Sequence, residues 1–236
     1  MASGRSTGRD TAVRAGKAAA QLGVKAARRD AYWPAQLAAL AAVLLYFALP
    51  DKIIVGPRWV VPSLEAILLL GLVVTTPSAK RPYFPGRRRA AIGLIALVTA
   101  ANLVSLALLV HYLLRGGKAG GHELILAGTE IWLTNMLIFS LWFWEFDRGG
   151  PHARSQPDPP PPDLLFQQMV VPEYSPLNWQ PTFVDYFYTS LTNVTAFSPT
   201  DTMPLSPWAK ILMGVESMIA LVTIGLVAAR AVNILG

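Results

Sequence analysis

The sequence predicts an all-α, polytopic membrane protein with five transmembrane helices and one re-entrant, pore-like half-helix. The composition is the first observation: of the 236 residues 53% are apolar and 14% are charged, with a mean hydropathy of +0.41, whereas soluble domains carry about a quarter charged residues. Second, five stretches come close to the ~20 mostly apolar residues that cross a bilayer as a helix. Third, a segment near the C-terminal end is too polar for a span and too apolar for an ordinary loop.

The composition also excludes several kinds of site. The chain has no cysteine, so it holds neither a disulfide framework nor a thiolate metal site. Its three histidines, His111, His122 and His152, do not stand at metal-ligand spacing, and we expect no metal and no cofactor. Basic flanks of membrane spans explain the net charge of +6, so nucleic acid is not an expected partner.

Residues 1–31 are predicted to form a basic cytoplasmic segment. Its cations are Arg5, Arg9, Arg14, Lys17, Lys25, Arg28 and Arg29. Two interpretations stay open: an Ala-rich helix that lies on anionic headgroups, or a frayed basic tail. The segment is too long and too charged for a cleavable signal peptide.

Residues 32–146 are predicted to form a four-helix membrane region. Its apolar stretches are Tyr32–Leu49, Arg58–Thr76, Ala90–Leu114 and Glu123–Phe146, and the fifth stretch of the chain is Trp208–Leu235. The second stretch is the shortest and holds Pro62 near one end, so its boundary is the least defined.

Lysine and arginine set the expected orientation. Besides residues 1–31, the loop between the second and third stretches is basic, with Lys80, Arg81, Arg87, Arg88 and Arg89, while the loops on either side of it carry two cations each. Basic loops stay in the cytoplasm, so we expect a cytoplasmic N-terminus in a multi-pass protein of the inner membrane, surrounded by membrane lipids.

Residues 147–181 are predicted to form a Pro-rich connecting loop. The run "PDPPPP" favours extended polyproline II backbone. A flexible linker and a fixed collar over the membrane region are the two alternatives. Apolar residues favour the collar; they are Phe166, Met169, Val170, Val171, Tyr174, Leu177 and Trp179.

Residues 182–236 hold the segment that is neither span nor loop. The stretch Phe183–Phe197 has 15 residues, which reach roughly 22 Å as a helix, short of a ~30 Å hydrocarbon core. Thr182 and Asp185 suit a helix N-terminus, and Pro199 breaks the helix before the last span begins at Trp208. Non-helical backbone is tolerated at membrane depth only when protein shelters it or it lines a watery cavity. The pattern therefore predicts a re-entrant hairpin at a pore or polar vestibule.

The string T-A-F-S-P-T-D is followed by Pro204, Trp208 and Lys210. This region resembles the pore of tetrameric potassium channels, where a pore helix ends in T-T-V-G-Y-G-D before a proline, a tryptophan and a basic residue. The resemblance covers about 50 residues and implies a homo-oligomer, a tetramer by analogy, with a filter-like loop of Thr195, Ala196, Phe197, Ser198, Pro199, Thr200 and Asp201. The whole chain also resembles bacterial membrane proteins of unknown function that share "W-x-P-x-F-x-D-Y" and "F-S-P-T-D-T-M-P-L", which supplies no activity.

The filter-like loop departs from the potassium-channel pattern at its diagnostic positions. Ser198 and Thr200 replace both glycines, and Pro199 replaces the tyrosine. A potassium filter stacks backbone carbonyls in a conformation that glycine permits and that these residues resist. We therefore expect no potassium selectivity, but a wider, hydroxyl-lined constriction that passes monovalent ions.

The charge pattern and the resemblance disagree on sidedness. Four spans after a cytoplasmic N-terminus would make the hairpin enter from the cytoplasm, whereas potassium-channel hairpins enter from outside. The pore could be inverted, as in glutamate-receptor channels; an early helical hairpin could fail to cross; or Phe183–Phe197 could cross as a sixth span. The charge count favours the inverted loop.

Several polar residues fall inside the apolar stretches. Glu65 and Glu130 are intramembrane acids, and the pore-lining candidates are Thr192, Glu216, Ala220 and Thr223. Such residues usually face a cavity or a bundle interior. The alternative for Glu216 is hydrogen bonding between helices, with Asn135 or Asn102 as partner. At the end of the fourth stretch, Glu145, Asp147 and Arg148 are predicted to form an interfacial ion-pair cluster, and Gly149 and Gly150 a sharp exit.

Three functions remain open. The first is an ion-channel-like pore-loop protein that conducts weakly or without selectivity. The second is a non-conducting structural or sensory protein that retains the pore-loop fold, and the third is a proton-coupled transporter that uses the buried glutamates. No catalytic residues are predicted, because no nucleophile or metal site accompanies the carboxylates, and we do not expect an enzyme.

Overall fold

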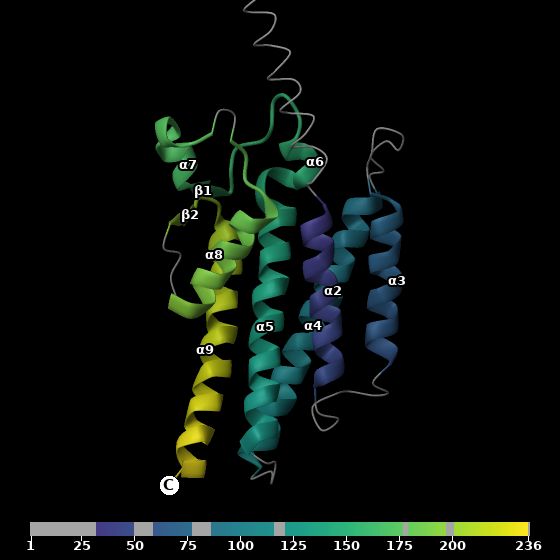
Figure 1. Ribbon diagram of the computed structural model, residues 1–236, viewed down its shortest axis with the longest axis vertical. Coiled ribbons are helices and arrows are strands. Elements are labelled where there is room, and N and C mark those ends of the chain that lie inside the picture. The colour runs from purple at the N-terminus through teal and green to yellow at the C-terminus, as the bar shows by residue number, and fades with distance from the viewer. Residues whose placement is uncertain are drawn as a thin grey trace, which may run out of the picture.

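Long helices stand side by side in this protein, and a cap of short elements covers one end of them (Figure 1). The computed structural model describes residues 32–49, 59–76, 86–115, 121–176, 179–196 and 201–235. The basic segment 1–31 and residues Phe197 to Thr200 of the filter-like loop lie outside the described residues.

All five predicted spans form helices. They are α2 (Trp33–Ala48), α3 (Val60–Val74), α4 (Gly86–Leu114), α5 (Gly121–Phe146) and α9 (Pro207–Leu235). Only α4, α5 and α9 are long and apolar enough to cross a membrane on their own among the described residues. With 16 and 15 residues, α2 and α3 reach roughly 24 and 22 Å, less than the ~30 Å of a hydrocarbon core. The structure thus supports membrane character, and the count of five spans stays a prediction.

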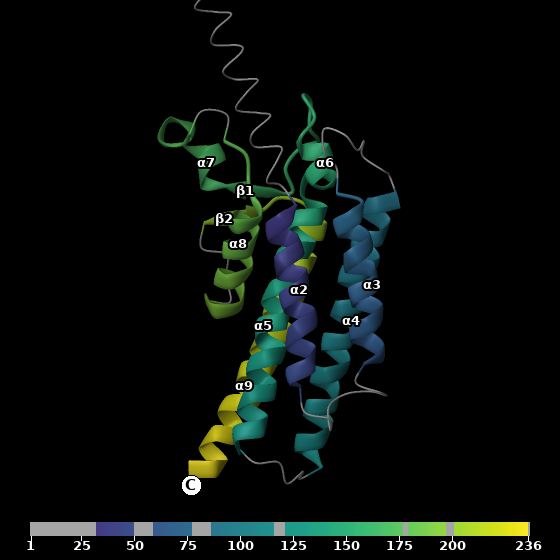
Figure 2. The same ribbon diagram turned by 45° about the vertical axis from the view of Figure 1, so that its right-hand side comes forward.

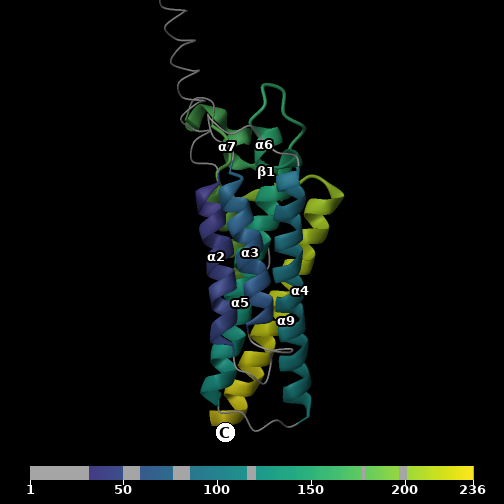
Figure 3. The same ribbon diagram turned by 90° about the vertical axis from the view of Figure 1, so that its right-hand side faces the viewer.

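Successive helices from α2 to α5 run in opposite directions (Figures 1 and 3). Gln36 near the start of α2 donates a hydrogen bond of 2.7 Å to Thr76, just after α3. Trp142 near the end of α5 donates one of 3.0 Å to Thr99 on α4. The cap therefore covers the start of α2, the end of α3, the start of α4 at Arg87 and Arg88, and the end of α5.

Helix α5 is the centre of the bundle and packs against α2, α4, α8 and α9. Its core side chains include Ile131, Ile138, Phe139 and Phe143, each no more than 2% exposed. The outer faces of the surrounding helices are apolar as well: Leu37 and Leu44 on α2, Ile67 and Leu70 on α3, and Ile211 and Met218 on α9 are all more than half exposed. Exposed apolar surface on this scale is unusual on a soluble monomer and suits lipid or further protein.

The Pro-rich loop forms the cap and packs onto the bundle. Its elements are η2 (Asp147–Gly149), α6 (Pro151–Arg154), β1 (Leu164–Phe166), α7 (Gln167–Val170) and η3 (Pro172–Tyr174). Strand β1 pairs antiparallel with β2 (Thr202–Pro204), so Leu164 lies opposite Pro204 and Phe166 opposite Thr202. The sequence did not predict this small sheet, because three-residue strands are too short to show an alternating pattern.

The cap residues expected to make a collar divide into two groups. Phe166 is 4% exposed and stacks edge-on against Trp179 and Tyr186, with ring centroids 5.8 and 5.4 Å away. Met169 also packs against the core, whereas Val170, Val171 and Tyr174 are exposed and Leu177 lies outside the described residues. The fixed collar is therefore favoured over the flexible linker, because Phe166, Met169 and Trp179 pack onto the bundle.

Helix α8 (Phe183–Ala196) starts at the cap and lies along the upper part of α5 and α9 (Figures 1 and 2). Its N-terminus matches the expectation, because the backbone N–H and the hydroxyl of Thr182 both donate to the Asp185 carboxylate, at 2.7 and 2.8 Å. Its 14 residues reach roughly 21 Å. Helix α9 then runs from the cap end to the far end of the molecule. The long helices α5 and α9 are therefore antiparallel, and the cap, α8 and β2 connect them.

Candidate functional site

One face of α8 is buried against α5 and α9, and its spacing follows the helical repeat. Tyr186, Ser190, Asn193 and Val194 are each no more than 1% exposed, at the i, i+4, i+7, i+8 positions that share a helix face. The opposite face carries Val184 and Tyr188, which are 65% and 50% exposed. Two groups of polar residues hold the buried face, one deeper in the bundle and one at the cap.

We call the deeper group the α8 seam: Asn135 on α5, Ser190 and Asn193 on α8, and Glu216 and Ser217 on α9. The Asn193 amide donates to Oε2 of Glu216 at 2.6 Å and to the Met213 carbonyl at 2.9 Å. Its own oxygen accepts a 3.1 Å hydrogen bond from Ser217. Three helices therefore meet through neutral amides, hydroxyls and a single carboxyl group.

The Glu216 side chain lies at the centre of the seam and is 0% exposed. Its Oε1 atom hydrogen-bonds with the Ser190 hydroxyl, which also lies 2.7 Å from the Met136 carbonyl oxygen. The Asn135 amide donates to the backbone carbonyl of Glu216 at 3.2 Å. This arrangement favours the interpretation of Glu216 as an interhelical hydrogen-bonding residue; Asn102, the other partner considered, lies on α4 and takes no part in the seam.

We call the second group the cap cluster: Arg88, Glu145, Asp147, Arg154, Asp163 and Tyr186. Asp147, 1% exposed, accepts hydrogen bonds from the Tyr186 hydroxyl at 2.6 Å and from the backbone N–H groups of Asp163 and Leu164 at 2.8 and 3.2 Å. Burial raises the pKa of the Tyr186 phenol well above its usual value, so this group stays a neutral donor.

Arginines surround the carboxylates of the cap cluster. The buried Arg154 guanidinium donates to the carbonyl oxygens of Trp144 and Asp147 at 2.6 and 2.9 Å and lies 5.0 Å from the centre of the Tyr186 ring. Arg88 pairs with Glu145 at 3.5 Å. The ion-pair cluster predicted from Glu145, Asp147 and Arg148 is therefore only partly present: Glu145 pairs with Arg88, and the Asp147 carboxylate accepts from neutral donors. Arg148 contributes its backbone N–H, which donates to Asp163 at 3.0 Å.

The backbone turns sharply at the end of α5, as the two glycines predict. Arg148, Gly149 and Gly150 have φ values of 53°, 75° and 96° in succession. A Cβ atom on Gly150 would come within 2.9 Å of the Glu145 carbonyl oxygen. Only glycine fits there, and this turn directs Asp163 and Leu164 onto Asp147.

Sequence reasoning missed Arg88, Arg154, Asp163 and Tyr186 as members of the cap cluster. Arg88 and Asp163 are far from Asp147 along the chain, and no local spacing connects them. Tyr186 could have been identified from the sequence as a residue of the buried helix face, because it shares that face with Ser190 and Asn193.

The remaining predicted site residues are scattered. Thr195 is exposed and its hydroxyl bonds back to Leu191 at 2.7 Å, Ala196 ends α8 and Asp201 is exposed. The half-buried Thr192 donates to Tyr188 and Thr189 of its own helix, both at 3.0 Å. Ala220 and Thr223 are 0% and 1% exposed, inside one copy of the chain, and their role as pore-lining residues stays a prediction.

The two intramembrane acids lie apart from the seam. Glu65 on α3 is 1% exposed, and neither of its carboxyl oxygens has a hydrogen-bond partner among the described residues. Glu130 is half-buried on α5, on the far side of the seam from the cap. The structure therefore does not bring the glutamates together into one site.

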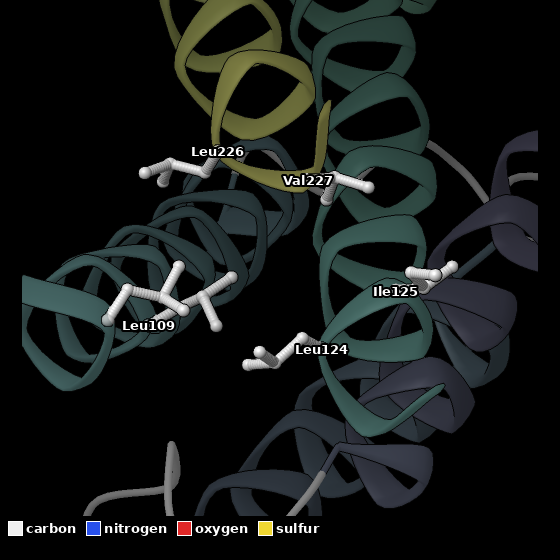
Figure 4. Close-up of a pocket in the computed structure, with 6 residues that line it drawn as sticks. Leu109, Leu124, Ile125, Leu226 and Val227 are labelled. Atoms are coloured by element: carbon white, nitrogen blue, oxygen red, sulfur yellow. The ribbon is translucent and has the colours of Figure 1, made fainter. Parts of the chain in front are cut away.

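Two cavities of the described part of the chain differ in size and lining. A pocket of about 180 Å³ lies beside the cap cluster, lined by Phe143, Phe146, Asp147, Asp163, Leu164, Ser206, Trp208, Ala209 and Leu212. A second gap, of about 10 Å³, lies between α4, α5 and α9 near the opposite end and has a wholly apolar lining that includes Leu109, Leu124 and Val227 (Figure 4). The second is no larger than one water requires and lacks polar partners for it. No group of residues suited to a metal ion occurs within the described ranges.

Comparison with known proteins finds no matching family model, no matching curated protein and no matching solved structure. The likeness to potassium-channel pores therefore depends on the sequence alone, from Tyr188 through the last span.

Proposed function

We propose that this protein is a pore-loop integral membrane protein that assembles as a homo-oligomer, a tetramer by its resemblance to potassium channels, and conducts ions weakly or without selectivity. The observation that carries the proposal is the half-length helix α8, which packs against both of the full-length helices α5 and α9. An outer helix, a short helix and an inner helix in this order are what the resemblance implies for a pore region.

The polar content of α8 supports its position at membrane depth. Ser190, Asn193 and Thr189 are each no more than 1% exposed, and all three side chains have hydrogen-bond partners in the same chain. Satisfied polar groups remove most of the cost of placing such a helix away from water. The seam then fastens the buried face of α8 to α5 and α9.

The surface of α9 supports assembly. In its most apolar stretch only 28% of the residues are buried, against 61% in α5. Gly214 and Gly225 lie on the exposed surface of α9 and have open space around them. Small residues at such positions let helices of neighbouring copies approach closely.

The arginines near the start of α4 support a cytoplasmic entry for the hairpin. Arg87, Arg88 and Arg89 lie at the end of the bundle that the cap covers, and basic residues favour the cytoplasmic side. The pore loop would then be inverted relative to potassium channels.

Reconstitution of the purified, folded protein into planar bilayers tests conduction. We expect small currents that do not distinguish sodium from potassium. Absence of current above that of empty bilayers, in protein whose helicity and oligomeric state are verified, would contradict conduction. Protease or cysteine labelling of residues 155–161, for which Ser155→Cys gives a single site, tests which side the cap faces.

A non-conducting scaffold is the second candidate, and the completeness of the seam favours it. The buried polar side chains of α8 are bonded within their own chain, which leaves few of them to line a pore. Phe197→Ala and Pro199→Gly discriminate the two functions. A current that appears only in these variants indicates a plugged pore, and silence in both favours the scaffold.

A further inference from the structure

The hydroxyl group of Ser190 takes part in two close oxygen–oxygen contacts. One is with the Met136 carbonyl oxygen at 2.7 Å, and the other is with Oε1 of Glu216. A contact of this kind between two oxygens needs one hydrogen between them. The serine hydroxyl carries a single hydrogen, and a backbone carbonyl carries none.

A second hydrogen must therefore come from Glu216. If Ser190 donates to Met136, its contact with an ionised Glu216 is left without a hydrogen. If Ser190 donates to Glu216, its contact with Met136 is left without one. A protonated Glu216 gives each contact its own hydrogen, with its carboxyl O–H donating to Ser190 and the Ser190 O–H donating to Met136.

We infer that Glu216 is a proton-binding site, and that its neutral carboxyl group donates a hydrogen bond to Ser190 that fastens α8 to α9. The other carboxyl oxygen then accepts from Asn193, whose two amide hydrogens and one oxygen all have partners. The inference depends on the contacts of one chain and is independent of whether the assembly conducts.

The charges around the seam agree with a neutral carboxyl group. Glu216 is 0% exposed, and its carboxyl group forms hydrogen bonds only with the uncharged Ser190 and Asn193 among the described residues. Besides Glu216, the titratable residues of the three helices packed here are His122, Glu123, Glu130 and Glu145 on α5, Asp185, Tyr186 and Tyr188 on α8, and Lys210 and Arg230 on α9. None of these forms an ion pair with Glu216 in the described part of the chain. An unpaired buried charge would be costly in this setting.

Infrared difference spectroscopy of the full-length protein in lipid tests the inference. The wild type minus Glu216→Gln spectrum at neutral pH is expected to contain the C=O stretching band of a neutral carboxylic acid. Glutamine is the matched replacement, because its amide can donate to Ser190 and accept from Asn193. A difference spectrum that contains carboxylate bands instead, or neither kind, overturns the inference. Glu65→Gln is the control for a buried carboxyl group outside the seam.

Ser190→Ala provides a second, independent measurement. It removes the acceptor of the Glu216 proton and leaves the carboxyl group in place. We expect the carboxylic acid band to persist and to shift in frequency. An unchanged band shows that the Glu216 proton is not directed at Ser190 and contradicts the inference. This test remains available if the Glu216→Gln variant does not fold. Helicity by circular dichroism verifies the fold of each variant.

Discussion

The cap cluster and the α8 seam hold the two ends of the same buried helix face with different chemistry. At the cap, Tyr186 donates to an aspartate that lies beside the Arg154 guanidinium. About one turn further along α8, Ser190 and Asn193 reach a carboxyl group whose hydrogen bonds come from neutral side chains only. The cap cluster contains the Arg88–Glu145 ion pair, whereas the seam carboxyl group has no ion-pair partner among the described residues. The proposed membrane placement predicts this difference, because ion pairs are tolerated near the headgroups and become costly toward the centre.

The comparison also indicates what each group determines. The cap cluster joins segments distant in sequence, from Arg88 to Tyr186, and fixes the cap on the bundle. The seam joins only α5, α8 and α9 and fixes how α8 lies between them. Substitutions in the cap cluster should therefore destabilise the whole fold, and those in the seam should act mainly on α8.

The largest effect is expected from Asp147→Ala. This change leaves the Tyr186 hydroxyl and two backbone N–H groups without their acceptor. Each buried donor that is left unsatisfied costs about 1–3 kcal/mol. Thermal unfolding in detergent, followed by circular dichroism, measures the loss. Asp158→Ala, at an exposed aspartate of the same loop, is the control and should change stability by less than about 0.5 kcal/mol. Equal effects of the two variants would show that Asp147 does not organise the cap.

Asn193→Ala should have the next largest effect. The change removes donors to Glu216 and Met213 and the acceptor for Ser217, so buried polar atoms are left unsatisfied. The expected loss is about 2–3 kcal/mol, with faster proteolysis at α8 than elsewhere. The neighbouring Thr192→Ala is the matched control, because the Thr192 hydroxyl bonds only within its own helix. Uniform proteolysis along the chain would argue against a local role for the seam.

Tyr186→Phe separates the hydroxyl group from the ring. The phenylalanine ring can keep the edge-on contact with Phe166, while Asp147 loses a 2.6 Å hydrogen bond. A hydrogen bond to a charged group contributes about 1.5–3 kcal/mol. Urea titration at neutral pH should show this loss with an unchanged slope. A variant as stable as the wild type would indicate that the two backbone N–H groups suffice for Asp147.

The sequence predicted the helices well and the clusters only in part. Apolar stretches of about twenty residues and the pair Thr182 and Asp185 are local signals, and each of them corresponds to a helix or a helix start in the structure. Hydrogen bonding between Glu216 and Asn135 was among the alternatives, but Asn135 reaches only the Glu216 backbone carbonyl. The side-chain partners of Glu216 are Ser190 and Asn193, which were not among those named. The Arg88–Glu145 and Asp147–Asp163 contacts depend on how the cap folds back, and no periodicity encodes that.

The smallest change in stability is expected from Ser217→Ala, which tests whether Ser217 belongs to the seam. The Ser217 hydroxyl is half-buried and donates a 3.1 Å hydrogen bond to Asn193, which is worth about 0.5–1.5 kcal/mol. Alanine also favours a helix more than serine does, by up to about 0.5 kcal/mol, and this gain opposes the loss. Ser63→Ala, at an exposed position on α3, measures the helix term alone, so the difference between the two variants isolates the hydrogen bond. A difference of zero would mean that the Asn193 amide is held by Glu216 and Met213 without help, and that the seam ends at Glu216.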